Sequence, residues 1–302
     1  MTAVPRLLVA AAAVALAAPA HGRTWEQVYP LQRQQTFSFE DQGVTVTVTP
    51  PPPAPEDRDI SDEEFEATYK DATITVQFPG LPLYRVPADG YRSSVYGISV
   101  GIGRMARGDA APAVLIGGYS GGMHCCATLQ VVSLADGVPV SALLPMKDGD
   151  PVDRFPRDVD GDGVRDFDWI DGSLLYAFSS YAGSRPVPRI FNLRAGALVD
   201  VSREPRYARR FRAFAAEALA ECRKGETENA APCAAYAYAM AVQGKAEEGI
   251  RTAVGLAREP VWYPIDCTVE WVDDQCPDGK LREFAGFEDA LRWIMRENGY
   301  LP

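Results

Sequence analysis

Asp158-Val-Asp160-Gly-Asp162-Gly163-Val164-Arg165-Asp166-Phe167 is the stretch around which the rest of the chain is organised. Its four carboxylates alternate with other residues, and Gly163 can supply a sharp turn. Acidic groups packed this closely repel one another unless a cation lies between them, and a flexible cage of oxygen ligands suits Ca²⁺ best. We therefore predict a calcium loop over residues 158–168, to which the Val164 carbonyl adds a backbone ligand.

Two features separate this loop from an EF-hand. The twelfth position of an EF-hand loop is a bidentate glutamate, and Trp169 stands there in this chain. The flanks are not helical either, because Pro151 and Pro156 precede the loop and residues 169–170 and 173–178 follow it as predicted strands. The loop is therefore expected to lie in a β-rich region.

The pattern Asp-x-Asp-x-Asp-Gly-x-x-Asp-Phe resembles the calcium hairpin of FG-GAP/VCBS-type repeats, which form blades of secreted and cell-surface β-propellers. The resemblance implies that the side-chain ligands are Asp158, Asp160, Asp162 and Asp166. Those families repeat the motif, whereas it occurs once here, so a complete propeller is not expected. The alternative is an acidic surface turn that binds no ion.

Residues 1–20 have the features of a secretory signal peptide. Arg6 supplies the charged start, Leu7 to Ala18 form the apolar core, and Ala18-Pro19-Ala20 is a cleavage site. No later segment reaches the roughly 18 apolar residues of a membrane span. We expect a periplasmic or secreted chain without a membrane span. Its formal charge of −11 becomes −12 once Arg6 is removed, which disfavours nucleic acid as a partner.

All six cysteines lie beyond the signal peptide, and an even number in an exported chain favours disulfides. Cys222 ends one predicted helix and Cys233 begins the next, so a bridge between them would staple an αα-hairpin. Cys267 and Cys276 lie on either side of Trp271 and are predicted to form a second local bridge.

Cys125 and Cys126 are then left to each other. A vicinal bridge between them could be structural, or it could have a redox or ligand-contacting role, because strained turns gather at functional sites. With Met123 and His124 these thiols could instead hold a soft metal ion. Processing after Ala20 would also make His21 the first residue, a further possible copper ligand beside His124.

The residues before position 202 predict mostly strands. Clean alternation marks residues 36–40 and 44–48, and apolar runs mark residues 72–78 and 96–102. Two hairpins are also predicted, the first from residues 113–119 and 127–134, the second from residues 188–193 and 197–201. A Pro-rich connection at residues 50–55 and a capping box at residues 61–64, which opens a short helix, interrupt the strands.

The residues after position 202 predict helices. An apolar stripe from Phe211 to Cys222 recurs at helical spacing, a second helix begins near Pro232, and the last amphipathic helix runs from Leu281 to Met295. Residues 236–260 resemble one tetratricopeptide helical hairpin, with Gln243-Gly244 at its turn. A solenoid needs at least about three such repeats, so we interpret it as a helical cap on the sheets.

Two other motifs have competing interpretations. Gly118-Tyr-Ser120-Gly-Gly122 fits the G-x-S-x-G pattern of a hydrolase, but a strand is predicted after Ser120 and no histidine follows His124, so we favour a glycine-rich hairpin turn. An arginine cluster begins the first long helix and is interpreted as a solvated face, or as a surface for an anionic ligand or the acidic calcium region. It comprises Arg203, Arg206, Arg209, Arg210 and Arg212.

The sequence thus predicts an α+β protein. Residues 21–201 should form a propeller- or sandwich-like antiparallel β domain, and residues 202–302 a disulfide-stapled α-helical domain. We favour an exported, non-enzymatic Ca²⁺-binding protein with a structural role or a role in recognising an unidentified protein or glycan. The alternative is a periplasmic hydrolase that uses carboxylates in a cleft between the two domains.

Overall fold

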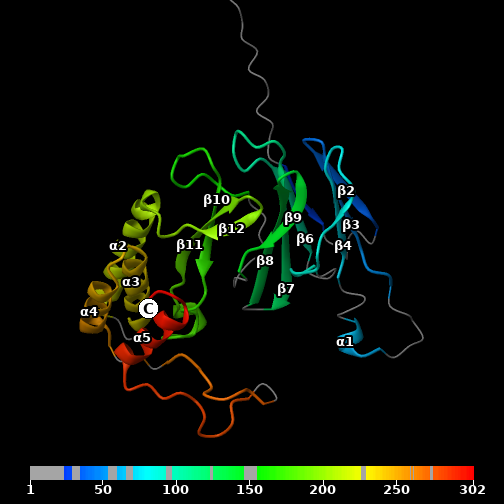
Figure 1. Cartoon of the computed structure of the whole chain (residues 1–302). Coiled ribbons are helices and arrows are strands. Elements are labelled where there is room, and N and C mark those ends of the chain that lie inside the picture. The colour runs from blue at the N-terminus through cyan, green and yellow to red at the C-terminus, as the bar shows by residue number, and fades with distance from the viewer. Residues whose placement is uncertain are drawn as a thin grey trace, which may run out of the picture.

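The computed structural model describes residues 24–28, 35–53, 60–65, 71–92, 97–122, 125–145, 155–225, 229–258, 260, 262–272 and 275–302. Within these ranges the fold is α+β, as predicted. Three antiparallel sheets pack in series, and a helical layer covers the last sheet (Figure 1). Their strands follow the order of the chain except for β1, which comes first in the sequence but pairs in the second sheet. The predicted signal peptide, residues 1–20, lies outside the described residues.

The first sheet is a four-stranded meander. Its strands are β2 (Phe37–Asp41), β3 (Val44–Thr49), β4 (Thr73–Gln77) and β5 (Tyr84–Arg85), hydrogen-bonded in that order. The alternation in β3 points its valines to one face, where they are buried against the second sheet. A short helix, α1 (Asp62–Phe65), precedes β4, and the Glu64 N–H donates to the Ser61 hydroxyl at 3.1 Å, as the capping box predicts.

The second sheet is the centre of the β-rich part. Its strands, in spatial order, are β1 (Thr24–Val28), β6 (Ile98–Gly103), β7 (Ala113–Gly122), β8 (Cys125–Ala135) and β9 (Val138–Leu143). Both faces are covered. In β7, Val114 and Ile116 pack toward the first sheet, whereas Leu115 packs toward the third, which explains why this strand is apolar at successive positions.

The third sheet carries the predicted calcium loop at its first strand. It consists of β10 (Asp166–Asp171), β11 (Val187–Arg194) and β12 (Ala197–Asp200), paired in that order. The predicted hairpin at residues 188–201 is confirmed, and its tight turn places Ala195 and Gly196 at φ 47° and 80°.

One predicted strand is wrong. Residues 173–178 form turns rather than a strand, and a short 3-10 helix, η2 (Tyr181–Gly183), follows them. Leu174 and Phe178 are buried in the core of the helical layer instead of on a sheet face. The apolar residues of this stretch therefore dock the third sheet onto the helices.

The helical layer begins with the 3-10 turn η3 (Pro205–Tyr207). Four helices follow: α2 (Ala208–Lys224), α3 (Ala230–Val242), α4 (Ala246–Leu256) and α5 (Phe287–Glu297). Every residue of α3 except Pro232 is buried, because α2 and α4 pack on either side of it. None of the helices in the described ranges has the length and apolar character needed to cross a bilayer.

Two disulfides lie in this C-terminal part, and both were predicted. Cys222 and Cys233 join α2 to α3, with Cα atoms 4.8 Å apart. Cys267–Cys276 bridges the segment between α4 and α5. The last helix is shorter than predicted, since it begins at Phe287; Leu281 lies outside it and forms an isolated β-bridge with Cys267.

Candidate metal centre

The acidic loop lies between an isolated bridge at Arg157 and the first residue of β10, and its own carboxylates fold it. The Asp158 carboxylate accepts hydrogen bonds from the Gly161 and Gly163 N–H groups, at 2.6 and 2.9 Å. These bonds hold the pKa of Asp158 below its usual value. Both glycines have a φ of 88°, which favours glycine, so the loop turns sharply around this one carboxylate.

Three of the four predicted side-chain ligands converge. One carboxylate oxygen each from Asp158, Asp160 and Asp166 lie within 4.8 Å of one another. Across the described ranges, no other three His, Cys, Asp or Glu side chains come this close. A cation with bonds of about 2.3–2.6 Å to oxygen could bridge such a group.

Asp162 points elsewhere. Its Oδ1 accepts the Val164 N–H at 2.7 Å, and its Oδ2 pairs with the guanidinium of Arg206. The structure therefore places this fourth predicted ligand at the edge of the cluster.

Asp166 anchors the loop to the helical layer. The residue is 1% exposed, and its Oδ1 accepts hydrogen bonds from the Asn192 amide and from the Tyr207 hydroxyl, both at 2.5 Å. Its Oδ2 accepts the Val159 N–H at 2.7 Å. Burial and the bond to Asp166 raise the pKa of Tyr207, which keeps this hydroxyl a donor. Strand β11 and turn η3 thus both contact the first residue of β10.

Asp160 is the least satisfied carboxylate of the cluster. Its side chain is 3% exposed, yet its Oδ2 receives no hydrogen bond from the described residues. Burial raises the pKa of Asp160, and the charges of Asp162 and Asp166 act in the same direction. A buried carboxylate oxygen without a donor is unfavourable, and a cation would relieve both the burial and the repulsion.

Arg206 supplies the positive charge that faces the cluster. Its Nε lies 3.3 Å from Asp160 Oδ2 and 2.9 Å from Glu204 Oε2. Its Nη2 donates to the Asn192 Oδ1 at 2.8 Å. Of the interpretations of the arginine cluster, contact with the acidic loop therefore holds for Arg206, and Arg210 also lies 3.6 Å from the Asp168 carboxylate at the end of that loop. The arginine cluster was visible in the sequence, but nothing in the sequence distinguishes Arg206 from the neighbouring arginines.

The cluster suits an oxygen-seeking cation by its chemistry. Three carboxylates and one guanidinium leave a net negative charge, and all the convergent atoms are oxygens, which Ca²⁺ and Mg²⁺ prefer. Two of the carboxylates lie on a tight loop and one on a strand, so the donor set combines a flexible part with a rigid part. The residues present thus fit a Ca²⁺ ion.

The G-x-S-x-G motif lies in a β-hairpin rather than at a nucleophile elbow. Ser120 belongs to β7, and strand β8 follows it instead of a helix. Gly118 has a packing role, because a Cβ there would lie 1.7 Å from the Tyr91 carbonyl oxygen. The glycine lets residues 90–92 cross over the sheet, and the Tyr91 N–H donates to the Thr128 hydroxyl at 3.0 Å.

Several predicted positions cannot be placed. Met123, His124 and His21 lie outside the described residues, and so do the side chains of Cys125 and Cys126. The backbone of these two cysteines begins β8, where Cys125 pairs with Gly122. The vicinal bridge and the soft-metal alternatives therefore stay predictions.

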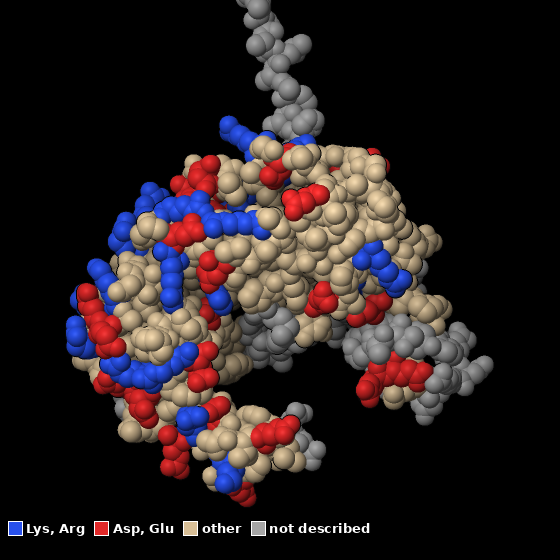
Figure 2. Space-filling model, in the orientation of Figure 1, with Lys and Arg blue, Asp and Glu red and all other residues tan. Residues whose placement is uncertain are grey.

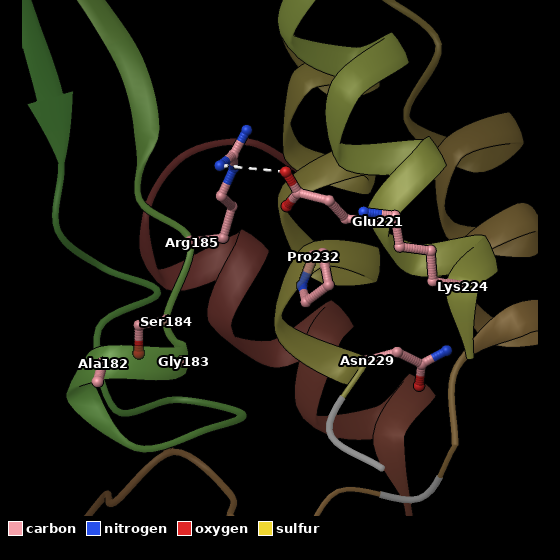
Figure 3. Close-up of a pocket in the computed structure, with 8 residues that line it drawn as sticks. All are labelled: Ala182, Gly183, Ser184, Arg185, Glu221, Lys224, Asn229 and Pro232. Carbon is pink, nitrogen blue, oxygen red and sulfur yellow. Dashed lines mark ion pairs between the residues drawn. The ribbon is translucent and has the colours of Figure 1, made fainter. Parts of the chain in front are cut away.

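Four pockets in the described part could in principle hold the carboxylate pair expected of a hydrolase. Figure 3 shows one of about 320 Å³ between the η2 turn and helices α2 and α3, where Arg185 pairs with Glu221 at 3.4 Å. Three further pockets contain Asp109, Asp200 and Glu204 respectively. Each of the four pockets has a single acidic side chain in its lining, so none of them supplies a pair.

Comparisons with known proteins place the chain among relatives from bacteria. No family model matches it, and no solved structure matches it. It is 25% identical over 198 residues to the uncharacterized protein y4bJ of Sinorhizobium fredii (strain NBRC 101917 / NGR234). That match spans 65% of this chain and 31% of the relative. It is 32% identical over 235 residues to the probable thylakoid lumen protein sll0997 of Synechocystis sp. (strain ATCC 27184 / PCC 6803 / Kazusa). That match spans 76% of this chain and 68% of the relative. The chain therefore belongs to the family of the probable thylakoid lumen protein sll0997.

Proposed function

We propose that this chain is an exported protein whose loop at residues 158–168 binds one Ca²⁺. The ion would have a structural role, in which it fixes the third sheet to the start of the helical layer. Asp158, Asp160 and Asp166 would be its side-chain ligands, Val164 would add its carbonyl, and Asp162 would join if Arg206 releases it. The single observation that carries this proposal is the buried Asp160 Oδ2, which lies inside a cluster of carboxylates, receives no hydrogen bond from the described residues and has only the ion pair with Arg206 at 3.3 Å.

Export is supported by three independent features. Residues 1–20 have the pattern of a signal peptide, and two disulfides lie in the C-terminal part, as is typical of oxidising compartments. The name of the Synechocystis relative assigns that protein to the thylakoid lumen. We accordingly propose a compartment outside the cytoplasm, either periplasmic or secreted.

A structural role for the ion follows from what the loop contacts. Asp166 joins β10 to Asn192 of β11 and to Tyr207 of η3, and Arg206 of η3 faces Asp160 and Asp162. Neutralising the carboxylates would hold the loop in the position that makes these contacts. The resemblance to the calcium hairpins of FG-GAP/VCBS-type repeats, which form blades of secreted and cell-surface β-propellers, supports the same role.

Thermal melting with calcium and with a chelator tests the proposal. Extracellular calcium modules bind at about 10⁻⁴–10⁻³ M, and an ion that binds only the folded form adds about 2.7 kcal/mol at a hundredfold excess over the dissociation constant. We therefore expect a higher melting temperature in calcium.

Asp160→Asn is the decisive variant. Its amide has the shape of the carboxylate but removes a charged ligand, so most of the calcium dependence should disappear. Because burial already disfavours ionised Asp160, the metal-free variant should melt no earlier than the metal-free wild type. The control Asp57→Asn, two residues after the Pro-rich stretch 50–55 in the sequence, should keep the full response. A wild type that melts alike in calcium and chelator would refute the proposal.

A further inference from the structure

The segment between α4 and α5 forms an arm, which we define as the described residues 262–272 and 275–285. Its two sides are joined by the Cys267–Cys276 disulfide and by backbone hydrogen bonds, from Thr268 N–H to the Lys280 carbonyl and from Arg282 N–H to the Asp266 carbonyl, both at 2.9 Å. The base of the arm is held by ring contacts, Tyr263 with Phe284 and Phe284 with Trp293. Figure 1 shows the arm below the helical layer, extended away from it.

The arm carries large apolar side chains that its own molecule does not cover. Six of them are exposed by 43–72%: Trp262, Ile265, Val269, Trp271, Val272 and Leu281. The described part of the arm has four acidic side chains, Asp266, Glu270, Asp278 and Glu283, against the two cations Lys280 and Arg282, and Arg282 pairs with Asp266 at 2.7 Å. A cross-linked hairpin with exposed tryptophans is pre-organised for binding, because little conformational freedom is lost on contact. The exposed apolar side chains of the arm predict an apolar surface on its partner, and the acidic side chains of the arm predict that cations border that surface.

The same chain contains a surface of this kind. A groove of about 540 Å³ lies between the start of α2 and the end of α3, with Pro205, Ala208 and Val242 in its lining. Its other lining side chains include the cations Arg203, Arg212 and Lys245. The one acid in the lining, Glu204, is paired with Arg194 and Arg206. In Figure 2, Lys and Arg side chains are frequent over the helical side of the molecule, interspersed with Asp and Glu.

In one molecule the arm leaves the end of the helical layer opposite to the groove. The groove lies where α2 begins and α3 ends, whereas the arm starts beyond the far end of α4. Thirteen residues of α3, at 1.5 Å each, separate the two ends by about 20 Å. An arm that points away from its own groove can reach the groove of a neighbour.

We propose that this protein forms a two-fold dimer in which the arm of each copy docks in the α2–α3 groove of the other. Two-fold symmetry makes the contact reciprocal, so that two identical arm-in-groove contacts form at once and the assembly closes. A tryptophan side chain buries about 150–250 Å² at such a site. The net charge of −11 opposes self-association only weakly at physiological salt, because the repulsion between charges more than about 8 Å apart is screened. The attraction between the arm acids and the groove cations would be screened less, since these groups would be in contact in the dimer. The inference does not depend on calcium binding.

Sedimentation of the purified mature chain tests the dimer. At about 100 µM, above the micromolar constants of weak standard-size interfaces, the wild type should sediment as a dimer that dissociates on dilution. Trp271→Ser in the arm and Arg212→Glu in the groove are both at exposed positions, and each should raise the dimer dissociation constant at least tenfold. Leu83→Ser, which removes an apolar side chain near β5 that is more exposed than Trp271, should leave the dimer intact.

Mixing the two defective variants separates docking from general loss of fold. The Arg212→Glu chain keeps a normal arm and the Trp271→Ser chain keeps a normal groove. At a concentration where neither variant dimerises alone, their mixture should therefore form a heterodimer through one contact. A wild type that stays monomeric at this concentration overturns the proposal, as does a dimer that survives both substitutions. Binding of the wild type to phosphatidylcholine vesicles that Trp271→Ser abolishes would also overturn it, since the arm would then serve a lipid surface.

Discussion

Replacing Arg206 by glutamine should tighten calcium binding while it weakens the metal-free protein. The Nε of Arg206 lies 3.3 Å from Asp160 Oδ2, and a calcium ion bound to that oxygen would lie about 2.3–2.6 Å beyond it. The two positive charges would then be at most about 6 Å apart. Even at the dielectric constant of water, their repulsion is about 1.4 kcal/mol, which corresponds to a tenfold change in affinity.

The opposite effect is expected without the ion. Arg206 is the cation nearest to Asp160, whose side chain is 3% exposed, but the arginine itself is 32% exposed and partly screened by solvent. Its loss should therefore lower metal-free stability by about 1–2 kcal/mol, less than the cost of breaking a fully buried pair. In a chain of this size, that is a drop of roughly 2–4 °C in melting temperature per kcal/mol.

Calcium titration and melting curves of the same samples measure both effects. Arg251→Gln is the matched control, because it removes one exposed positive charge from α4 and should change neither quantity appreciably. If Arg206→Gln binds calcium no more tightly than the wild type, the guanidinium does not face the ion and the proposed geometry is wrong.

Three further changes test other parts of the structure. Replacing both Cys222 and Cys233 by serine should lower the free energy of unfolding in urea by about 2–3 kcal/mol, because the bridge closes a loop with a sequence separation of 11; an unchanged midpoint would contradict this. Gly118→Ala would place a methyl group 1.7 Å from a carbonyl oxygen of the neighbouring loop, so it should cost about 1–3 kcal/mol in the same assay. Two hydrogen bonds from Arg292, both 2.9 Å, lower the pKa of Glu247 in the folded protein below its usual value of 4.5. The stability that this pair contributes is therefore fully present above pH 4.5, and it is lost as the pH falls through the lowered pKa of the folded protein. Glu247→Gln should therefore flatten the acid side of the stability profile, and an unaltered profile would show that the pair does not form.

Local patterns in the sequence predicted much of the fold because they report which faces are buried. The valines at alternate positions of β3 predict a strand with one buried face, and the apolar stripe of α2 predicts a helix with one buried stripe. The hairpin β7–β8 was also predictable from its apolar runs and glycine turn. Strands β1, β5 and β9 were missed, since they are short or lack a clear alternation of apolar residues.

The errors arose where burial comes from a distant part of the chain. The apolar residues of 173–178 predicted a strand, yet Leu174 and Phe178 are buried by helices that begin thirty or more residues later. The acidic loop was predictable from its spacing alone. Its contact with Arg206 was not, because 44 residues separate Asp162 from that arginine and only the packing of η3 against β10 and β11 brings them together.

A calorimetric titration of the wild-type chain with calcium tests the central claim most directly. The account predicts saturable binding of one Ca²⁺ per chain, with a dissociation constant of about 10⁻⁴–10⁻³ M, and loss of the binding heat in Asp160→Asn. The absence of saturable binding in the wild type at millimolar calcium, or equal binding heat in Asp160→Asn, would contradict it.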